Sequence, residues 1–182
     1  MTNTWNCKFL RKINDYVYLF NVEKHKQLKN KILKNIQATP FTKIDNVYKT
    51  DWEIDYYLER KYWDQNIQEI FNNCTNFIKK DLYGDIEFNT FLHNYWFHIY
   101  NKNSEFKWHT HDKTNFSGIY YISLPDKKYR TEFLSLKTEA QEGNILIFPA
   151  FLAHRSPINK SIKNKTVLAF NFSLGYRNLG PS

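Results

Sequence analysis

The stretch Trp-His-Thr-His-Asp at residues 108–112 decides how the rest of the chain can be interpreted. Its surroundings are aromatic, as in a β-strand, and side chains two residues apart on a strand project to the same face. His109 and His111 would therefore present two imidazoles on one side. A third histidine, His154, follows much later in the chain. A β-barrel can bring such distant strands together, and neutral imidazole nitrogens suit Fe, Zn, Cu or Ni.

The segment that leads to His154 has the pattern of a turn, a buried strand and a second turn. Gly143 is typical of a turn, residues 144–148 form an apolar run, and Pro149 ends that run. His154 then stands at the start of another short strand. Since histidines occur on both segments at strand edges, the sequence predicts a mononuclear metal site.

Length and composition limit the class of protein. The 182 residues fit a single domain, and 18% of them are aromatic, which favours a folded, β-rich chain. The two cysteines, Cys7 and Cys74, are too few for a disulfide framework or a cysteine-rich zinc site. The sequence shows no signal-peptide pattern and no apolar run long enough to span a bilayer. We therefore expect a cytoplasmic protein without a membrane partner.

The formal net charge of +8 could indicate an acidic partner such as nucleic acid. The basic residues are dispersed, however, and no motif of a nucleic-acid-binding module occurs. A solvated, lysine-rich surface is the favoured interpretation, and nucleic acid is a less favoured partner.

The N-terminal part, residues 1–88, differs in pattern from the rest. It is predicted to hold a strand at 16–20, a lysine-rich helix at 22–37, an irregular aromatic segment at 41–57 and a stronger helix from Trp63 to Ile78. Gly84 stands where a helix C-terminus often needs glycine. We expect this part to be a helical elaboration that packs on the outside of a sheet.

From residue 89 onward the pattern changes to short strands separated by turns, which is typical of a sandwich or barrel. The predicted fold class is mainly β with flanking helices, a double-stranded β-helix of the jelly-roll or cupin-like type over residues 89–176 of one domain. The predicted strands are 90–100, 106–111, 117–124, 132–136, 144–148, 153–157 and 166–174.

The last of these strands has two different faces. Lys165, Val167, Ala169 and Asn171 share a small, polar face with a cation at its start, and the alternate residues are apolar. Such a face could line a barrel that holds a charged ligand. A half-exposed strand with Lys165 in solvent would have the same pattern, so periodicity leaves both interpretations open.

Four motifs together resemble a known family. They are His109-X-His111, the Ser-Gly-Ile-Tyr-Tyr-Ile run at 117–122, the segment 143–154, and Lys-Thr-Val-Leu-Ala-Phe-Asn at 165–171. In this order they resemble the 2-oxoglutarate- and Fe(II)-dependent oxygenases, in particular a group of small members from bacteria and bacteriophages that is similar to prolyl hydroxylases. The likeness covers about half of the chain.

The resemblance implies one Fe(II) in a double-stranded β-helix. His109 matches the first ligand, His154 the distal ligand, and His111 the position where the wider superfamily has a carboxylate. Asp112 is the alternative third ligand. Strand alternation points Asp112 away from His109, so it could bind only if the strand ended or bulged there.

The resemblance also implies a binding site for 2-oxoglutarate as cosubstrate. Lys165 matches the cation that binds its distal carboxylate, where the closer group usually has arginine. Lys163 has the same parity and is the fallback cation. Tyr121 matches a strand tyrosine that often bonds the same carboxylate, and Asn171 could contact the cosubstrate or support a ligand.

The implied activity is oxidation by O₂ of an unactivated C–H bond, with release of succinate and CO₂. Two alternatives are a three-histidine, cupin-type dioxygenase without cosubstrate and a non-catalytic barrel-fold binding protein. The substrate, a small molecule or a peptide, is expected to meet a rim formed by residues 41–57 and 126–131. His93 and His98 are expected to be packing or surface residues, and His25 to be solvated.

Overall fold

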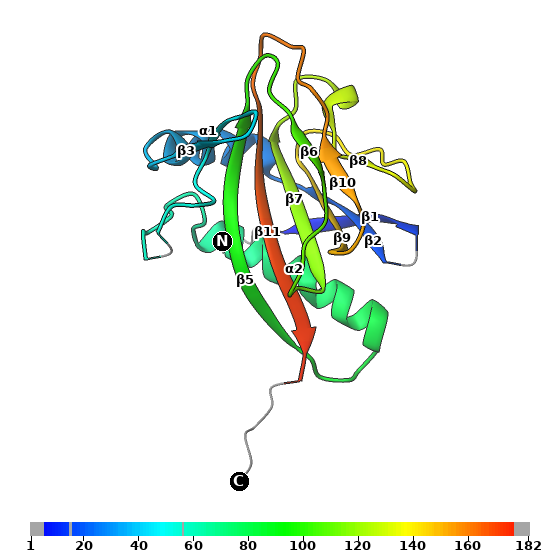
Figure 1. The fold of residues 1–182 in the computed structure, drawn as a ribbon. Helices are drawn as coiled ribbons and strands as arrows, with labels where there is room; N and C mark the ends of the chain where they lie inside the picture. Colours follow the sequence, from blue (N-terminus) through cyan, green and yellow to red (C-terminus); the bar gives the residue numbers. More distant parts are fainter. Residues whose placement is uncertain (1–5, 15, 56, 177–182) are drawn as a thin grey trace.

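Two antiparallel β-sheets form the framework of the protein (Figure 1). The structure, a computed structural model, describes residues 6–14, 16–55 and 57–176. The large sheet has the strand order β1-β2-β9-β7-β11-β5-β4-β3, and the small sheet has the order β6-β10-β8. The strands are β1 (Cys7–Asn14), β2 (Val17–Val22), β3 (Thr42–Ile44), β4 (Val47–Thr50), β5 (Asn89–Tyr100), β6 (Phe106–His109), β7 (Phe116–Ser123), β8 (Glu132–Phe133), β9 (Asn144–Pro149), β10 (His154–Ser156) and β11 (Lys165–Gly175).

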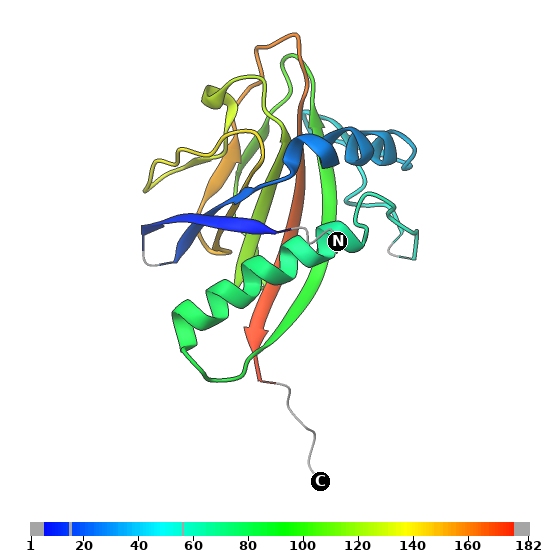
Figure 2. The ribbon, with the colours of Figure 1, turned by 180° about the vertical axis from the view of Figure 1, so that it is seen from behind.

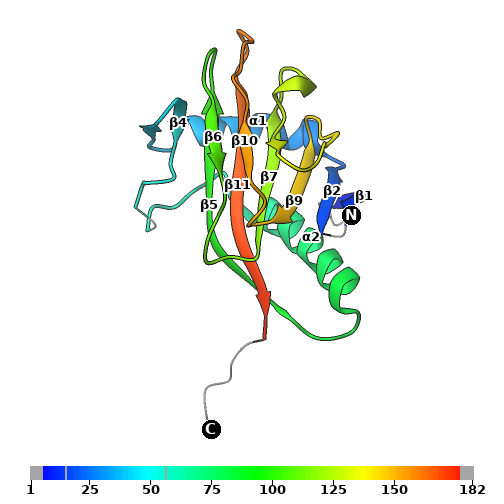
Figure 3. The same cartoon turned by 45° about the vertical axis from the view of Figure 1, so that its right-hand side comes forward.

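The small sheet lies over β7 and β11 of the large sheet (Figures 1 and 3). Residues of both sheets line one pocket between them. This arrangement is a jelly-roll, so the predicted fold class is confirmed. Each strand predicted from residue 89 onward is present, although β6 ends at His109 and β8 has only two residues.

Two helices cover the outer face of the large sheet (Figure 2). They are α1 (His25–Gln37) and α2 (Gln65–Tyr83). The apolar face of β11 packs against α2, with the ring of Phe71 5.4 Å from that of Phe170 and 5.5 Å from that of Phe172. Burial of the Phe71, Phe170 and Phe172 rings between β11 and α2 contributes strongly to the stability of the fold. The opposite face of β11 is thereby turned toward the pocket.

The ends of α2 follow from its sequence. The Asp64 side chain accepts hydrogen bonds from the backbone N–H groups of Asn66 and Ile67, which satisfies two of the free donors at the helix start. Gly84 follows the last turn with a φ of +62°, a conformation that favours glycine. The predicted second helix is therefore confirmed, and it extends to Tyr83. None of the helices in the described ranges is both long and apolar enough to cross a membrane.

The N-terminal part supplies strands as well as helices. β2 pairs with β9, with Phe20 opposite Ile145, and β4 pairs with β5, with Thr50 opposite His98. The expectation of an irregular segment at 41–57 was wrong in part, because β3 and β4 lie within it, and β1 was not predicted. β1 extends one edge of the large sheet by pairing with β2, and β3 and β4 extend the other edge, where β4 joins the distant β5.

A buried ion pair fixes the loop after β4. The Asp51 carboxylate, fully buried, accepts hydrogen bonds from Arg60 Nε at 2.7 Å, from the Tyr62 hydroxyl and from the Phe97 backbone N–H at 2.8 Å. The loop is thereby attached to the C-terminal half of β5. Trp52, the next residue, stacks on Trp96 with ring centres 5.9 Å apart.

Asp51→Ala should lower the free energy of unfolding by roughly 3–5 kcal/mol, because it leaves the Arg60 guanidinium buried without its anion. Chemical denaturation followed by circular dichroism would measure this loss. Asp85→Ala removes an exposed carboxylate and is the control, with an expected change within about 0.5 kcal/mol. Equal stability of the two variants would contradict the structural role of Asp51.

Candidate metal centre

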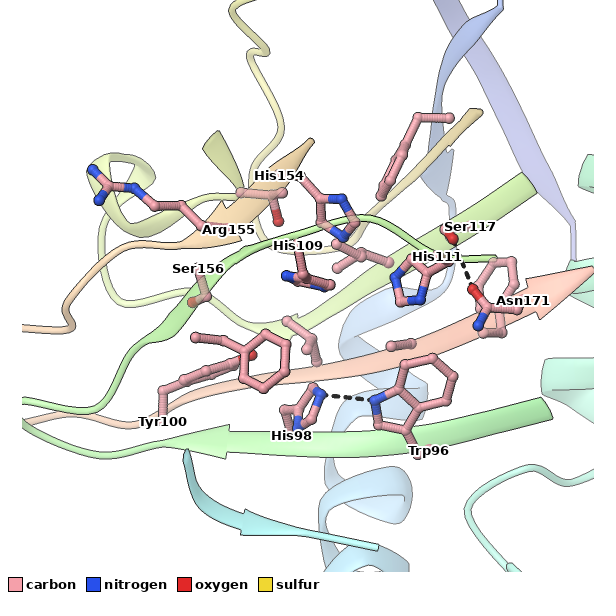
Figure 4. A pocket seen from close by; sticks show the side chains of 18 of the residues that line it. Trp96, His98, Tyr100, His109, His111, Ser117, His154, Arg155, Ser156 and Asn171 are labelled. Atoms are coloured by element: carbon pink, nitrogen blue, oxygen red, sulfur yellow. Dashed lines mark hydrogen bonds between the residues drawn. The ribbon is translucent and has the colours of Figure 1, made fainter. Parts of the chain in front are cut away.

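Three histidines meet between the two sheets (Figure 4). His109 ends β6, His154 begins β10, and the two residues are directly paired across these strands. His111 follows β6 and is positioned by its backbone N–H, which donates to the Ala150 carbonyl at 2.9 Å. Each of the three histidines offers one ring nitrogen, and these three nitrogens lie within 4.8 Å of one another. This cluster can hold a single metal ion.

Backbone carbonyls fix the proton on two of the rings. Nδ1 of His109 lies 2.8 Å from the Lys107 carbonyl oxygen, and Nδ1 of His154 lies 2.9 Å from the Leu152 carbonyl oxygen. A carbonyl oxygen can only accept, so each Nδ1 carries the proton. Nε2 of each ring therefore keeps a free lone pair, as a metal ligand requires.

The environment keeps all three imidazoles neutral. Burial is the main cause that lowers each pKa, to about 3 for His154 and about 4 for His111, with a smaller shift in the same direction for His109. Repulsion by the charged form of His109 lowers the pKa of the other two further. At neutral pH the cluster is thus a set of uncharged nitrogen donors.

Asp112 lies outside this cluster. β6 ends at His109, and Lys113 has a φ of +57°, so the chain turns away immediately after the motif. Asp112 is exposed, whereas His111 faces the other two rings. Of the two alternatives for the third position, the structure places His111 with His109 and His154.

A buried cation lies in the same pocket. Lys165, at the start of β11, is 1% exposed, and its Nζ donates to the Ser156 hydroxyl at 2.8 Å. Burial lowers the pKa of Lys165 to about 7. None of the ion pairs among the described residues includes Lys165, and Glu132, the acid whose charge acts on it, is paired with Arg155. An anionic ligand would therefore compensate an otherwise costly buried charge.

The polar face of β11 lines the pocket, which decides between the two interpretations of this strand. Asn171 lies six residues from Lys165, roughly 20 Å along an extended strand. Its Oδ1 accepts from the Ser117 hydroxyl at 2.7 Å. Asn171 thus lies at the end of the pocket remote from Lys165. Lys163, the fallback cation, is exposed and is not among the residues that line the pocket.

Tyr121 is fully buried beside Lys165, whose Nζ lies 5.9 Å from the centre of the tyrosine ring. Its hydroxyl donates to Thr131 Oγ1 at 2.9 Å and accepts from the Thr131 backbone N–H at 3.1 Å. The Tyr100 ring is nearer, with its centre 5.0 Å from Nζ. Tyr100 and Ser156 are thus the neighbours of Lys165 that the sequence analysis did not include.

His98 forms part of the pocket wall rather than the surface. It is 6% exposed, and its Nε2 accepts a hydrogen bond from Trp96 Nε1 at 2.7 Å (Figure 4). Burial lowers its pKa to about 3. Trp96, His98 and Tyr100 alternate along β5, so their shared face was visible in the sequence. The expectation for His25 was wrong, because it is 7% exposed and its Nδ1 lies 2.9 Å from the Tyr120 hydroxyl.

Gly118 explains the Ser-Gly step in the motif at 117–122. A Cβ atom at this position would lie 2.1 Å from Cζ of Phe170. The Phe170 ring on β11 therefore occupies the space that a side chain at position 118 would need. Ser117 is held beside Asn171 by this close approach of the two strands.

No protein-family model matches the sequence, and no curated protein matches it. Solved structures do. The viral collagen prolyl hydroxylase vCPH of Paramecium Bursaria Chlorella virus-1, in complex with 2OG, aligns with a TM-score of 0.58 and 14% identity over 88% of this chain and 97% of its own. A Pseudomonas putida prolyl-4-hydroxylase aligns with a TM-score of 0.56 and 13% identity over 82% of this chain and 85% of its own.

AviO1 from Streptomyces viridochromogenes Tue57 aligns with a TM-score of 0.58 and 7% identity over 93% of each chain. The chain has the fold of the 2OG-Fe(II) oxygenases. The expected fold of this superfamily is thereby confirmed.

The residues present fit both groups that these oxygenases use. Three neutral imidazole nitrogens are suitable donors for Fe(II). The buried Lys165, which has no carboxylate partner among the described residues, suits the distal carboxylate of 2-oxoglutarate. The three histidines and Lys165 line the same pocket.

Proposed function

We propose that this protein is an Fe(II)- and 2-oxoglutarate-dependent oxygenase that hydroxylates an unactivated C–H bond. The observation that carries the proposal is the joint placement, in one pocket, of three converging imidazoles and a buried lysine that has no acidic partner among the described residues. Either feature alone occurs in other proteins. Together they supply a site for a redox metal and a site for a dianionic cosubstrate that chelates it.

His109, His111 and His154 would hold the iron, and Lys165 would bind the distal carboxylate with support from Ser156. When bound, Fe(II) and 2-oxoglutarate supply the oxidising chemistry, in which O₂ is consumed and succinate and CO₂ are released. The protein contributes orientation and exclusion of water. Apolar side chains, among them Val167 and Phe148, line the same pocket and help to exclude water from it.

The substrate is expected at the end of the pocket near Trp96, Ser117 and Asn171. This end is uncharged, whereas the lining cation Arg155 lies on the opposite side (Figure 4). An uncharged group is therefore the expected target. The aligned prolyl hydroxylases support proline-containing peptides as the first substrates to test, and a gain of one oxygen atom by mass spectrometry would identify the product.

An anaerobic titration tests the proposal. The metal-free protein receives Fe(II) and then 2-oxoglutarate, and the visible spectrum is followed for the charge-transfer band of a chelated keto acid. A band that needs both additions supports the oxygenase. Iron binding without a response to 2-oxoglutarate would favour the three-histidine, cupin-type dioxygenase. No iron binding would leave a barrel-fold binding protein.

The cupin-type alternative is supported by the donor set, which contains three histidines and no carboxylate. Such a dioxygenase has no need for a buried cation beside its metal. Lys165 is therefore the residue that separates the two functions, because only the cosubstrate-dependent enzyme uses it.

Binding of 2-oxoglutarate should weaken as the pH rises above about 7. The pKa of Lys165 is about 7 in the free protein, and a bound carboxylate raises it. Above this pH a growing fraction of free protein carries the neutral amine, so the dissociation constant should rise by up to roughly tenfold per pH unit. The pKa values of about 3 and 4 for His154 and His111 keep the ligands neutral throughout this range.

Dissociation constants of 2-oxoglutarate measured at pH 6 to 9 would reveal this dependence. Lys165→Arg is the matched control, since a guanidinium stays protonated throughout and should give a flat profile. A wild-type profile that is equally flat would show that Lys165 is not the group that binds the carboxylate.

A further inference from the structure

The chain's two cysteines meet at a seam outside the pocket. Cys7 begins β1 and Cys74 lies in the middle of α2, and their sulfur atoms are 3.1 Å apart although the residues are 67 positions apart in the sequence. Both are free thiols. The sequence contains two cysteines, and both take part in this contact.

Two further contacts hold β1 and α2 together, and both involve residues of α2 that lie C-terminal to Cys74. The ribbons of β1 and α2 can be followed in Figure 2. The Phe9 and Phe77 rings stack with centres 4.3 Å apart, and Lys12 Nζ lies 2.8 Å from an oxygen of Asp81. Cys74, Phe77 and Asp81 share one face of α2 because they are three and four residues apart. The sulfur contact is therefore part of a packed seam, which brings the two thiols into position before any reaction.

We propose that Cys7 and Cys74 form an oxidative modification site, which hydroperoxides convert to an intrachain disulfide between β1 and α2. The proposal is independent of the metal centre, since no cysteine is among the residues that line that pocket.

The two thiols differ in a way that assigns their roles. Cys7 is partly exposed and can meet a peroxide, whereas Cys74 is fully buried. The hydrogen bond with Cys74 lowers the pKa of Cys7, and burial raises the pKa of Cys74. Cys7 is therefore the sulfur that reacts with the oxidant, and Cys74 is the sulfur that resolves the product.

The reaction balances with one hydroperoxide. The Cys7 thiolate attacks the O–O bond, a sulfenic acid forms, and hydroxide leaves and takes up the proton released by Cys7. The Cys74 sulfur then displaces the hydroxyl group, so the S–S bond forms while the Cys74 proton leaves with that hydroxyl as water. For hydrogen peroxide, two thiols lose two electrons and two protons, and two molecules of water are produced.

A structural metal is a poorer explanation of this sulfur pair. Structural zinc takes four ligands. Among the described residues, the group of at least three possible metal ligands is the histidine cluster in the pocket, and it does not include Cys7 or Cys74. Packing alone would account for Cys74, because buried free cysteines behave as small apolar residues. It does not account for a partly exposed partner thiol in direct contact with it.

The disulfide would strengthen an edge of the fold. β1 is the first strand of the large sheet and pairs with β2 alone. A covalent link to α2 would prevent β1 from separating, so the midpoint of thermal unfolding should rise by roughly 5 °C or more on oxidation. Amide hydrogen exchange of β1 should slow in the same sample.

The test uses the whole 182-residue chain, reduced and metal-free, treated with hydrogen peroxide while folded. Free thiols and the intact mass are then measured after denaturation. The expected result is loss of both thiols, a mass lower by two hydrogen atoms, a monomeric product and full reversal by dithiothreitol. Persistence of both thiols would overturn the proposal, as would accumulation of Cys7 sulfinic acid with Cys74 still reduced.

Two variants separate the roles of the thiols. In Cys7→Ser the buried Cys74 should resist peroxide, and in Cys74→Ser the sulfenic acid on Cys7 should persist and react with dimedone. Rapid oxidation of Cys74 in Cys7→Ser would reverse the assignment. The mass measurement on the unchanged protein decides for or against the disulfide even if a variant fails to fold.

Discussion

His154→Ala is expected to abolish Fe(II) binding while the protein stays folded. His154 begins β10, its Nδ1–H is held by the Leu152 carbonyl, and its Nε2 is one of three converging donors. Two remaining imidazoles form a much weaker site. The affinity should fall by more than about a hundredfold, since even indirect partners of metal ligands change affinity by roughly 10–100-fold. Anaerobic Fe(II) titration with quantified metal content measures this change.

Two control variants make this result specific. His98→Phe replaces an equally buried imidazole of the pocket wall that is outside the three-nitrogen cluster, and His93→Ala replaces an exposed one. Both should retain iron at near wild-type affinity. If His154→Ala bound iron as tightly as these controls, the assignment of the metal centre would be wrong.

Lys165→Met should have two opposite effects. Loss of the buried cation should weaken 2-oxoglutarate binding by roughly a hundredfold or more, because truncation of one partner of a buried ion pair costs several kcal/mol. Iron binding should be preserved, since Lys165 is not one of the clustered nitrogen donors. Titration of the iron-loaded variant with 2-oxoglutarate would measure the first effect.

The second effect is a gain in stability of the ligand-free protein. The pKa of Lys165 falls from its ordinary 10.5 to about 7, so the folded state binds this proton less tightly than the unfolded state. Below pH 7 the full cost of the buried charge is present, and it is relieved as the pH rises toward 10.5. Lys165→Met should therefore raise the unfolding free energy by roughly 2–4 kcal/mol at pH 7.

Thermal unfolding with and without iron and 2-oxoglutarate would show both effects of Lys165→Met in one experiment. Without ligands, the variant should have the higher midpoint of thermal unfolding. Saturating ligands should raise this midpoint more for the wild type than for the variant. Lys160→Met, at an exposed position, is the matched control and should change neither quantity. A variant that is less stable than wild type without ligand would contradict an uncompensated buried charge at Lys165.

Local sequence patterns were sufficient for most of the barrel. Strands such as β7 and β9 have apolar runs bounded by turn residues, and α2 has a helical apolar stripe between Asp64 and Gly84. Such signals depend on neighbours in the sequence, so they could be identified without a structure. β1, β3 and β4 gave no comparable signal, because β3 and β4 have only three and four residues and β1 is rich in cations. Such strands at the edges of a sheet depend on pairing that the local pattern does not show.

The sequence by itself determined which residue types are available to the site and their order along the chain: the histidines at 109, 111 and 154, and the polar face that begins at Lys165. It could also show that Trp96, His98 and Tyr100 share a face. Alternation of side chains in a strand is a local property, and it requires no knowledge of the partner strands.

Only the tertiary structure decided which of these faces is enclosed and what lies across from it. It placed His111 rather than Asp112 beside His154, turned Lys165 inward without an anionic partner among the described residues, and separated Asn171 from that cation. The physical reason is that burial, pKa and metal geometry depend on distances between strands that are remote in sequence. Those distances are set by the packing of the two sheets and the helices behind them.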